Sequence, residues 1–176
     1  MKLRKFIYKS VKSTNLTALK KIRTGSTSGI IRAYSQTHGR GRYGKRWISS
    51  KGNLFISIFF EIDLKKNLKK INNLNIKFKS NFLNKILNKK VSIKKPNDIL
   101  INGSKICGIL QEIITQNKKK YMILGIGINK KSSPVIKKYK TTYIDQHIKK
   151  NISNVEIFNS IRKLYEKKIG TLYKCT

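Results

Sequence analysis

The stretch Gln36-Thr37-His38-Gly39-Arg40-Gly41-Arg42-Tyr43-Gly44-Lys45-Arg46-Trp47 leads through a short connection into residues 53–60, Asn-Leu-Phe-Ile-Ser-Ile-Phe-Phe. Glycine lets the backbone approach a ligand closely, and arginine binds phosphate or carboxylate groups through paired hydrogen bonds. The glycines match the dinucleotide pattern G-x-G-x-x-G, but that pattern must open a helix. The aromatic and β-branched residues that follow predict a strand instead. The stretch therefore predicts an anion-binding loop that leads into a strand, and it argues against a dinucleotide-binding fold.

Two other kinds of glycine-rich loop fit this sequence less well. A protein-kinase phosphate loop also lies between two strands, but the chain has no His-Arg-Asp or Asp-Phe-Gly tripeptide. RNA-binding Arg-Gly tracts are longer and repetitive, whereas this loop occurs once and is irregular. Neither alternative explains the loop as well as a site for one bound anion.

The remaining pattern predicts an α+β fold. Strand signals lie at residues 4–8, 29–35, 91–94, 98–101, 105–115 and 120–128, and Asn102-Gly103 is a hairpin turn signal. Apolar spacing of three and four residues predicts a helix with a face formed by Leu68, Ile71, Leu74, Phe78, Phe82 and Ile86. Two more helices are expected at residues 13–21, with Ser13 or Thr14 as N-cap, and from a capping box at Ser153 and Glu156 to about residue 169. We expect a mixed, mostly antiparallel sheet with helices packed on one face, and a polar loop over residues 130–150.

The length of 176 residues suits a single domain over residues 1–176. No run of about 18 apolar residues predicts a membrane helix, and the N-terminus does not have the pattern of a signal peptide. Cys107 and Cys175 are then expected to be reduced thiols of a cytoplasmic protein, with Cys107 small and buried. The cysteines and the two histidines, His38 and His147, lack metal-ligand spacing, so no protein metal cage is expected.

A formal net charge of +34 is the most extreme property of the composition. Read directly, it favours a nucleic-acid-binding protein. However, the basic residues are mostly lysines dispersed along the whole chain beside Asn and Ile. These three residues share AT-rich codons, so a mutational bias explains the composition at least as well. The charge predicts salt-dependent attraction to acidic macromolecules in either case.

Four segments carry a more specific pattern. The loop from Gln36 to Trp47 is followed by Ser-x-Gly-Asn-Leu-Phe-x-Ser over residues 50–57. The other segments are Ser13-Thr14-Asn15, then Lys95-Pro96-Asn97-Asp98 with Lys-Ile-Cys-Gly-Ile-Leu-Gln-Glu over 105–112, and Gly125-Ile126-Gly127-Ile128-Asn129. In their order along the chain, over about residues 8–130, these four segments closely resemble the signature of biotin protein ligases, also called biotin–[acetyl-CoA-carboxylase] ligases.

The resemblance implies a biotin/lipoate ligase-like catalytic domain and an ATP-dependent ligase. Such enzymes join biotin to ATP, which gives biotinyl-5′-AMP and pyrophosphate, and then pass biotin to a lysine of a biotin carboxyl carrier protein domain of a carboxylase. Biotin and ATP are the implied substrates, and Mg²⁺ is expected with ATP. Positioning and electrostatic stabilisation supply most of the catalysis, so no nucleophile triad is expected.

The resemblance also assigns roles to residues. Lys105, Arg42 and Asp98 are the implied catalytic residues. The implied biotin-binding residues are Ser13, Thr14, Asn15, Gln36, Gly39, Arg40, Gly41, Arg42, Trp47, Lys105 and Gly108. The implied nucleotide-binding residues are Arg40, Arg42, Asn97, Lys105 and Asn129. Other interpretations stay open at single positions, because Ser13 could act as a plain N-cap, Trp47 as a packing anchor, and Asn129 as a turn cap.

Three departures from the family pattern stand out. Lys95 occupies the place of a family tryptophan that packs near the pocket. Loss of that tryptophan is expected to loosen the packing of the pocket. Only twelve residues precede Ser13, so we expect no N-terminal DNA-binding domain and no specific DNA partner. The chain reaches Thr176 soon after its last predicted helix, so we expect no SH3-like C-terminal domain. No membrane association is expected, and the oligomeric state, monomer or homodimer, is left open.

Two other functions remain as alternatives to the ligase. A lipoate or octanoate ligase or transferase of the same fold would have an Arg-Arg-x-x-Gly-Gly-Gly type of loop, which this chain lacks. A basic nucleic-acid-binding domain would gather its cationic residues and aromatic stacking platforms on one surface.

Overall fold

The computed structural model describes residues 1–62 and 68–172. Its strands are β1 (Lys5–Val11), β2 (Ser28–Gln36), β3 (Leu54–Ile62), β4 (Ser92–Lys94), β5 (Asp98–Ile101), β6 (Ser104–Gln116) and β7 (Lys119–Ile128). Its helices are α1 (Thr14–Arg23), α2 (Leu68–Leu87) and α3 (Asn154–Leu172), with the short 3₁₀ helix η1 (Ile144–Gln146). Each predicted strand and helix is present, with small shifts at the ends.

One seven-stranded sheet organises the described chain, in the order β1-β2-β3-β7-β6-β5-β4. The β1–β2 pair is parallel, and the other pairs are antiparallel. Asn102 and Gly103 join β5 to β6 with φ angles of 48° and 73°, as a tight hairpin turn with two left-handed residues requires. The predicted mixed, mostly antiparallel α+β sheet is confirmed.

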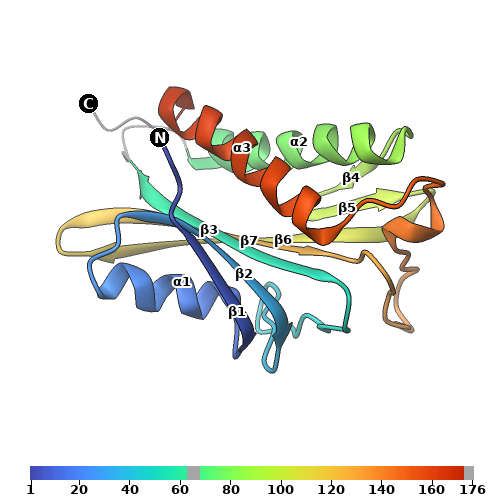
Figure 1. The fold of residues 1–176 in the computed structure, drawn as a ribbon, viewed down its shortest axis with the longest axis horizontal. Helices are drawn as coiled ribbons and strands as arrows, with labels where there is room; N and C mark the ends of the chain where they lie inside the picture. Colours follow the sequence, from blue (N-terminus) through green and yellow to red (C-terminus); the bar gives the residue numbers. More distant parts are fainter. Residues whose placement is uncertain (63–67, 173–176) are drawn as a thin grey trace.

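The helices cover both faces of this sheet, so the expectation that they pack on one face is wrong. Figure 1 shows α1 against one face and α2 and α3 against the other. The core is divided in the same way: Ala18 and Ile22 of α1 pack against Phe59, while Leu83 of α2 and Phe158 of α3 belong to a larger cluster on the opposite face. The physical reason lies in β3, where consecutive residues are buried and both faces need a cover.

The two long helices contribute apolar residues to the core where their side chains are described. Phe82 and Ile86 of α2 pack against the larger cluster. The predicted face residues Leu68, Ile71, Leu74 and Phe78 have side chains outside the described part. Among the described side chains of α3, over residues 154–169, the buried ones are Ile157, Phe158, Ile161, Tyr165 and Ile169.

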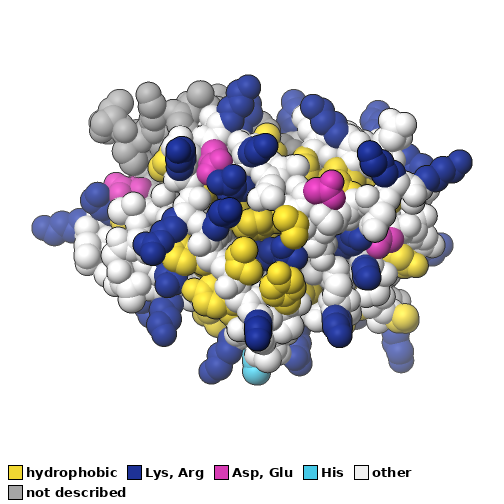
Figure 2. All heavy atoms as spheres, viewed as in Figure 1, with side chains coloured by type: hydrophobic (Ala, Val, Ile, Leu, Met, Phe, Trp, Pro, Cys, Tyr) yellow, Lys and Arg dark blue, Asp and Glu magenta, His cyan; other side chains and the backbone are white. Residues whose placement is uncertain are grey.

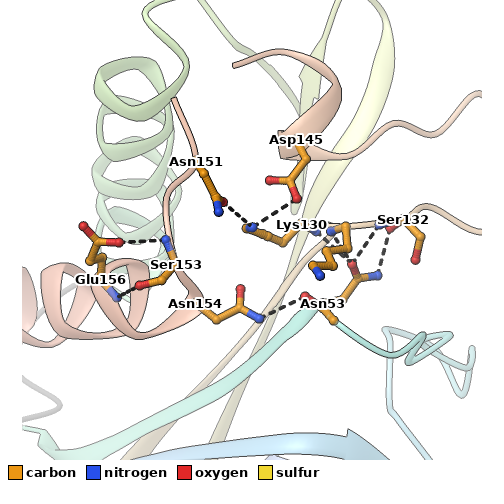
Figure 3. A network of polar contacts seen from close by, with 10 residues as sticks. Asn53, Lys130, Ser132, Asp145, Asn151, Ser153, Asn154 and Glu156 are labelled. Atoms are coloured by element: carbon orange, nitrogen blue, oxygen red, sulfur yellow. Dashed lines mark hydrogen bonds and ion pairs between the residues drawn. The ribbon is translucent and has the colours of Figure 1, made fainter. Parts of the chain in front are cut away.

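The predicted capping box at the start of α3 is confirmed. The Ser153 backbone N–H donates to Glu156 Oε2 at 2.7 Å, and the Glu156 N–H donates to Ser153 Oγ at 3.1 Å (Figure 3). The hydrogen bond from the Ser153 backbone, followed by that involving its side chain, lowers the pKa of Glu156 because both favour the charged carboxylate. At the start of α1, by contrast, Ser13 occupies the N-cap position without a capping hydrogen bond from its side chain.

The remaining expectations concern cysteines, membranes and charge. Cys107 is fully buried, and Cys175 lies outside the described residues. In the two described ranges, no helix has the length and apolar character that a membrane span requires. Figure 2 shows lysine and arginine side chains scattered over the visible face, with a few acidic side chains among them. On that face the charge does not form one nucleic-acid-binding stripe.

Candidate active site

A cavity of about 360 Å³ lies between the start of α1, strands β6 and β7, and the glycine-rich loop after β2. The loop supplies one wall, Lys94 to Asp98 a second, and Pro134 to Thr141 a third. Residues that are far apart in the sequence therefore meet in one concave, partly apolar site, as ligand pockets commonly require.

The structure brings nearly all of the predicted site residues to this cavity. Those that line it are Ser13, Thr14, Asn15, Gln36, Arg40, Gly41, Arg42, Trp47, Asn97, Asp98, Lys105, Gly108 and Asn129. Gly39 is the exception among the predicted residues. It is buried below the loop, where its carbonyl oxygen accepts a hydrogen bond from the Trp47 N–H at 2.9 Å. In the structure, Gly39 therefore helps to fix the backbone conformation of the loop.

Gln36 ties the start of α1 to the loop. Its Oε1 accepts hydrogen bonds from the Thr14 backbone N–H at 2.8 Å and from Thr14 Oγ1 at 3.1 Å. Its Nε2 donates to Ser49 Oγ at 3.1 Å. The helix start lacks a capping bond from Ser13, and the Gln36 amide satisfies one of its free N–H groups in place of that cap.

Asn15 joins the helix start to the sheet below. Its Nδ2 donates to Glu112 Oε2 at 2.7 Å, and its Oδ1 accepts from Ser57 Oγ at 2.5 Å. Glu112 also pairs with Arg40, at 2.8 Å between Oε1 and Nη2. This chain of polar contacts runs from β3 through α1 and β6 to the loop, and it holds the Arg40 guanidinium at the edge of the cavity.

Trp47 anchors the loop on the sheet. A Cβ atom added at Gly108 would lie 2.5 Å from Trp47 Cζ3, and one added at Gly127 would overlap the indole in the same way. The indole therefore lies flat against two neighbouring strands where glycine alone leaves room for it. The packing role that stayed open for Trp47 is realised in the structure, at a position that also lines the cavity.

The loop between these anchors is a compact turn. The Gly41 N–H donates to the Lys45 carbonyl at 2.7 Å, and the Lys45 N–H donates to the Arg42 carbonyl at 3.1 Å. Tyr43 has a φ of 54°, its ring is exposed, and Arg42 Nη2 donates to its hydroxyl at 2.9 Å. Within the described residues, Arg42 thus has no carboxylate partner, and its remaining donors can serve a bound anion.

Lys105 lies at the centre of the site. Its Nζ is 3.0 Å from Asp98 Oδ1, and it lies 5.3 Å from the centres of both the Trp47 and Tyr139 rings. Its side chain is 14% exposed. The ammonium group is therefore partly desolvated, held by a carboxylate and two aromatic faces, and directed at the cavity.

The two predicted asparagines differ in their surroundings. The Asn97 backbone carbonyl accepts from the Ile109 N–H at 3.0 Å, which holds the residue at the mouth of the β5–β6 hairpin. Asn129 is buried, and its Nδ2 donates to the Thr142 carbonyl at 3.1 Å.

Thr142 also contacts a histidine, since its Oγ1 lies 2.7 Å from Nε2 of His147. Burial, and then the charge of Lys89, lowers the pKa of His147.

Sequence reasoning missed part of the site. Ile136, Tyr139 and Thr141 line the cavity, although residues 130–150 were expected to be only a polar loop. No periodic pattern marks these positions. The only signal in the sequence is that Ile136 and Tyr139 are apolar residues in a lysine-rich segment. Glu112 was noted as part of a motif without a role, yet it links Asn15 and Arg40.

The cavity is strongly electropositive. Its seven cationic lining residues are Arg40, Arg42, Lys45, Arg46, Lys94, Lys95 and Lys105, and Asp98 is the one carboxylate among the described lining residues. Across residues 1–62 and 68–172, no group of three or more His, Cys, Asp or Glu side chains could hold a metal ion. The arrangement suits an anionic ligand, and it can bring carboxylate and phosphate groups together despite their mutual repulsion.

The sheet order and the position of this pocket define a class, the biotin/lipoate ligase-like catalytic domain. Residues 7–129 match the model of the Biotin/lipoate A/B protein ligase family, and the chain belongs to that family. It is 35% identical over 130 residues to the bifunctional ligase/repressor BirA of Bacillus spizizenii, covering 70% of this chain and 39% of the relative. The BirA of Escherichia coli is 31% identical over 122 residues, covering 68% of this chain and 38% of the relative. The chain thus spans about two fifths of the length of these curated relatives.

Solved structures agree with the family. A biotin protein ligase from Aquifex aeolicus, in complex with biotin and ATP, superposes with a TM-score of 0.78 at 27% identity and covers 97% of this chain and 72% of that one. A bipartite lipoate protein ligase from Thermoplasma acidophilum shares the fold at a TM-score of 0.65 and 11% identity, covering 100% of this chain and 87% of that one.

The packing of Trp47 gives a direct test of the loop arrangement. The substitution Gly108→Ala should displace the indole from the sheet, because the new methyl group would occupy its position. Trp47 is the sole tryptophan, so its emission maximum should move to longer wavelength as the indole enters water. The matched control is Gly125→Ala on the same surface, where a Cβ would meet Asn15 instead. Equal emission spectra for wild type and Gly108→Ala would contradict the packing described.

Proposed function

We propose that the chain is a biotin protein ligase that activates biotin with ATP and transfers it to a lysine of a carrier domain. Membership of the Biotin/lipoate A/B protein ligase family supports a ligase of this group. The similarity to a biotin protein ligase from Aquifex aeolicus and to BirA proteins supports biotin over lipoate. The chain spans only part of the curated relatives. We therefore propose the activity for this chain from the residues that line its own cavity.

The observation that carries the proposal is the convergence of Arg40, Arg42 and Lys105 on one cavity beside the start of α1. The donors of these residues suit a carboxylate and a phosphate held next to each other. Hydroxyl and amide groups of Ser13, Thr14, Asn15 and Gln36 line the same cavity. We assign them to the polar head group of biotin, since a ureido ring needs both hydrogen-bond donors and acceptors.

The proposed reaction has two steps. First, a carboxylate oxygen of biotin bonds to the α-phosphorus of ATP while the bond to the β-phosphate bridge breaks and pyrophosphate leaves. Second, the carrier lysine nitrogen bonds to the acyl carbon, the acyl–oxygen bond breaks, AMP leaves and the amine loses a proton. Lys105 and Arg42 stabilise the negative charge that gathers where the carboxylate and phosphate meet. Asn97 and Asn129 are assigned to the nucleotide side, and Asp98 is placed to orient either Mg-ATP or the incoming amine.

Magnesium belongs to this proposal as part of the substrate Mg-ATP. Asp98 is the one carboxylate among the described lining residues, and it is already paired with Lys105. Mg²⁺ commonly keeps several waters and takes its ligands from one or two carboxylates and the substrate phosphates. The donor set here fits that mode and does not supply an all-protein cage.

The proposed macromolecular partner is a biotin carboxyl carrier protein domain of a carboxylase. We place the reaction in the cytoplasm, where ATP is available. Lys95, which stands in place of the expected tryptophan, lines the cavity with Lys94 and adds positive charge there. The positive charge of Lys94 and Lys95 would attract an acidic partner as well as the nucleotide phosphates.

Removing the Lys105 ammonium tests the proposal at its centre. We expect Lys105→Ala to lower the rate of biotinyl-5′-AMP formation by about 10²-fold or more, because a charge-stabilising donor is lost in a partly desolvated site. Arg42→Ala should act in the same direction. The readout is biotin-dependent pyrophosphate release, and Lys119→Ala is the matched control because Lys119 pairs with Glu61 away from the cavity. Full activity of both site variants would refute the assignment.

The net charge gives a second expectation. Attraction between a chain of charge +34 and an acidic carrier should raise the association rate at low ionic strength. The kcat/KM for the carrier should therefore fall as salt rises from about 0.01 M to 0.15 M, across which the Debye length shortens from about 30 Å to about 8 Å. The kcat for biotinyl-5′-AMP formation serves as the internal control. A salt-independent kcat/KM for the carrier would rule out such steering.

A further inference from the structure

The third wall of the cavity is an irregular segment, residues 131–143, called here the wall loop. It leaves the end of β7 and returns just before η1. Pro134, Ile136, Tyr139 and Thr141 line the cavity, although no regular strand or helix holds them. The position of this wall must therefore come from contacts with other parts of the chain.

The wall loop is bound directly to Lys105. The Lys105 N–H donates to the Lys140 carbonyl at 2.9 Å, and the Thr142 N–H donates to the Lys105 carbonyl at 2.9 Å. The Tyr139 ring centre lies 5.3 Å from Lys105 Nζ. A shift of the wall loop would therefore disturb the surroundings of the ammonium group that we propose to be catalytic.

A single side chain, Asn53, fixes the first residues of the wall loop. Its Oδ1 accepts the backbone N–H groups of Lys130, Lys131 and Ser132 at 2.9, 3.0 and 3.2 Å. Its Nδ2 donates to the Ser132 carbonyl at 2.9 Å. Asn53 is 3% exposed, and Figure 3 shows its amide directed at the turn that follows Lys130. One amide thus replaces the regular backbone pairing that ends with β7.

Separate contacts hold the far end of the wall loop. Lys130 Nζ is 3.0 Å from Asp145 Oδ2 and donates to Asn151 Oδ1 at 3.3 Å (Figure 3). The Ile144 and Asp145 N–H groups donate to the Asn129 and Lys130 carbonyls at 2.9 and 3.0 Å. These bonds use the Lys130 ammonium and the Asn129 and Lys130 carbonyls, none of which bonds the Asn53 amide. Loss of that amide should therefore loosen the first part of the wall loop without unfolding the domain.

Asn53 also connects two walls of the cavity. It directly follows the glycine-rich loop and its connection, and its own N–H donates to the Ser50 carbonyl at 3.3 Å. It does not itself line the cavity. Asn53 therefore lies where the chain that leaves the glycine-rich loop, through its backbone, and the wall loop, through the Asn53 side chain, come together.

We propose that Asn53 is a positioning residue for the ligase reaction: it holds the wall loop so that Tyr139 and the backbone around Lys140 keep Lys105 directed into the cavity. This inference rests on the proposed function for its catalytic consequence. The structural part, that Asn53 holds residues 131–143, is independent of the substrate.

The test compares Asn53→Ala with Asn53→Asp. Alanine removes all four hydrogen bonds, whereas aspartate keeps acceptors for the three N–H groups and loses only the donor to Ser132. We expect Asn53→Ala to lower kcat for biotinyl-5′-AMP formation by about tenfold or more, and Asn53→Asp to recover most of that loss. Hydrogen exchange should accelerate at residues 130–132 and through the wall loop in Asn53→Ala. The KM for biotin should change little, since the biotin side of the cavity is held by Gln36 and Asn15.

The matched control is Asn154→Ala. The Asn154 Nδ2 donates to the Gly52 carbonyl at 2.9 Å, next to Asn53 but outside the wall loop. In Asn154→Ala, the hydrogen exchange of the wall loop and the kcat should stay near the wild-type values. Unchanged exchange at residues 130–143 in Asn53→Ala would overturn the proposal, as would faster exchange with an unchanged kcat, or an aspartate variant as impaired as alanine. A wild type that forms no biotinyl-5′-AMP would contradict the proposed function instead, and exchange alone would then decide whether Asn53 holds the wall loop.

Discussion

The contact between the Trp47 indole and the glycine positions of β6 and β7 is the constraint on which the site depends. Gly108 and Gly127 leave the space that the indole fills, and any side chain there would overlap it. This contact holds the far end of the glycine-rich loop against the sheet, while Gln36 and Thr14 hold its beginning. With both ends held, Arg40 and Arg42 of the loop line the same cavity as Lys105.

The charges of the site are arranged for binding more than for stability. The Arg40–Glu112 and Lys105–Asp98 pairs are partly exposed, and pairs of this kind contribute little to the free energy of folding. They hold cationic groups in place around a cavity that keeps a large excess of positive charge. An anionic ligand would relieve that excess, which is why we connect the pocket to a carboxylate and a phosphate bound together.

Much of the fold and site followed from local patterns. Aromatic and β-branched runs and turn residues predicted strands, while apolar spacing and capping residues predicted helices. Nearly all of the motif residues then met in one cavity. The face covered by each helix did not follow, because an amphipathic pattern shows that a helix packs but not on which side of a sheet. The run of consecutive apolar residues in β3 was the available sign in the sequence, and the burial of neighbours such as Ile58 and Phe59 agrees with it.

The wall loop was missed for a different reason. Its position comes from long-range contacts, the Asn53 amide and the bonds to Lys105, which leave no periodic trace in the local sequence. Tyr139 stands among lysines and marks no helix or strand face. Such contacts become visible only when distant segments are brought together in space.

The central claim is that the cavity selects biotin and uses ATP to activate it. Titration calorimetry of the purified chain with biotin, lipoate and octanoate, each with and without Mg-ATP, tests this claim most directly. The account predicts that biotin binds at least about tenfold more tightly than the other two acids, a difference of about 1.4 kcal/mol, and that Mg-ATP strengthens its retention as biotinyl-5′-AMP forms. Binding of lipoate or octanoate with no measurable binding of biotin would contradict it.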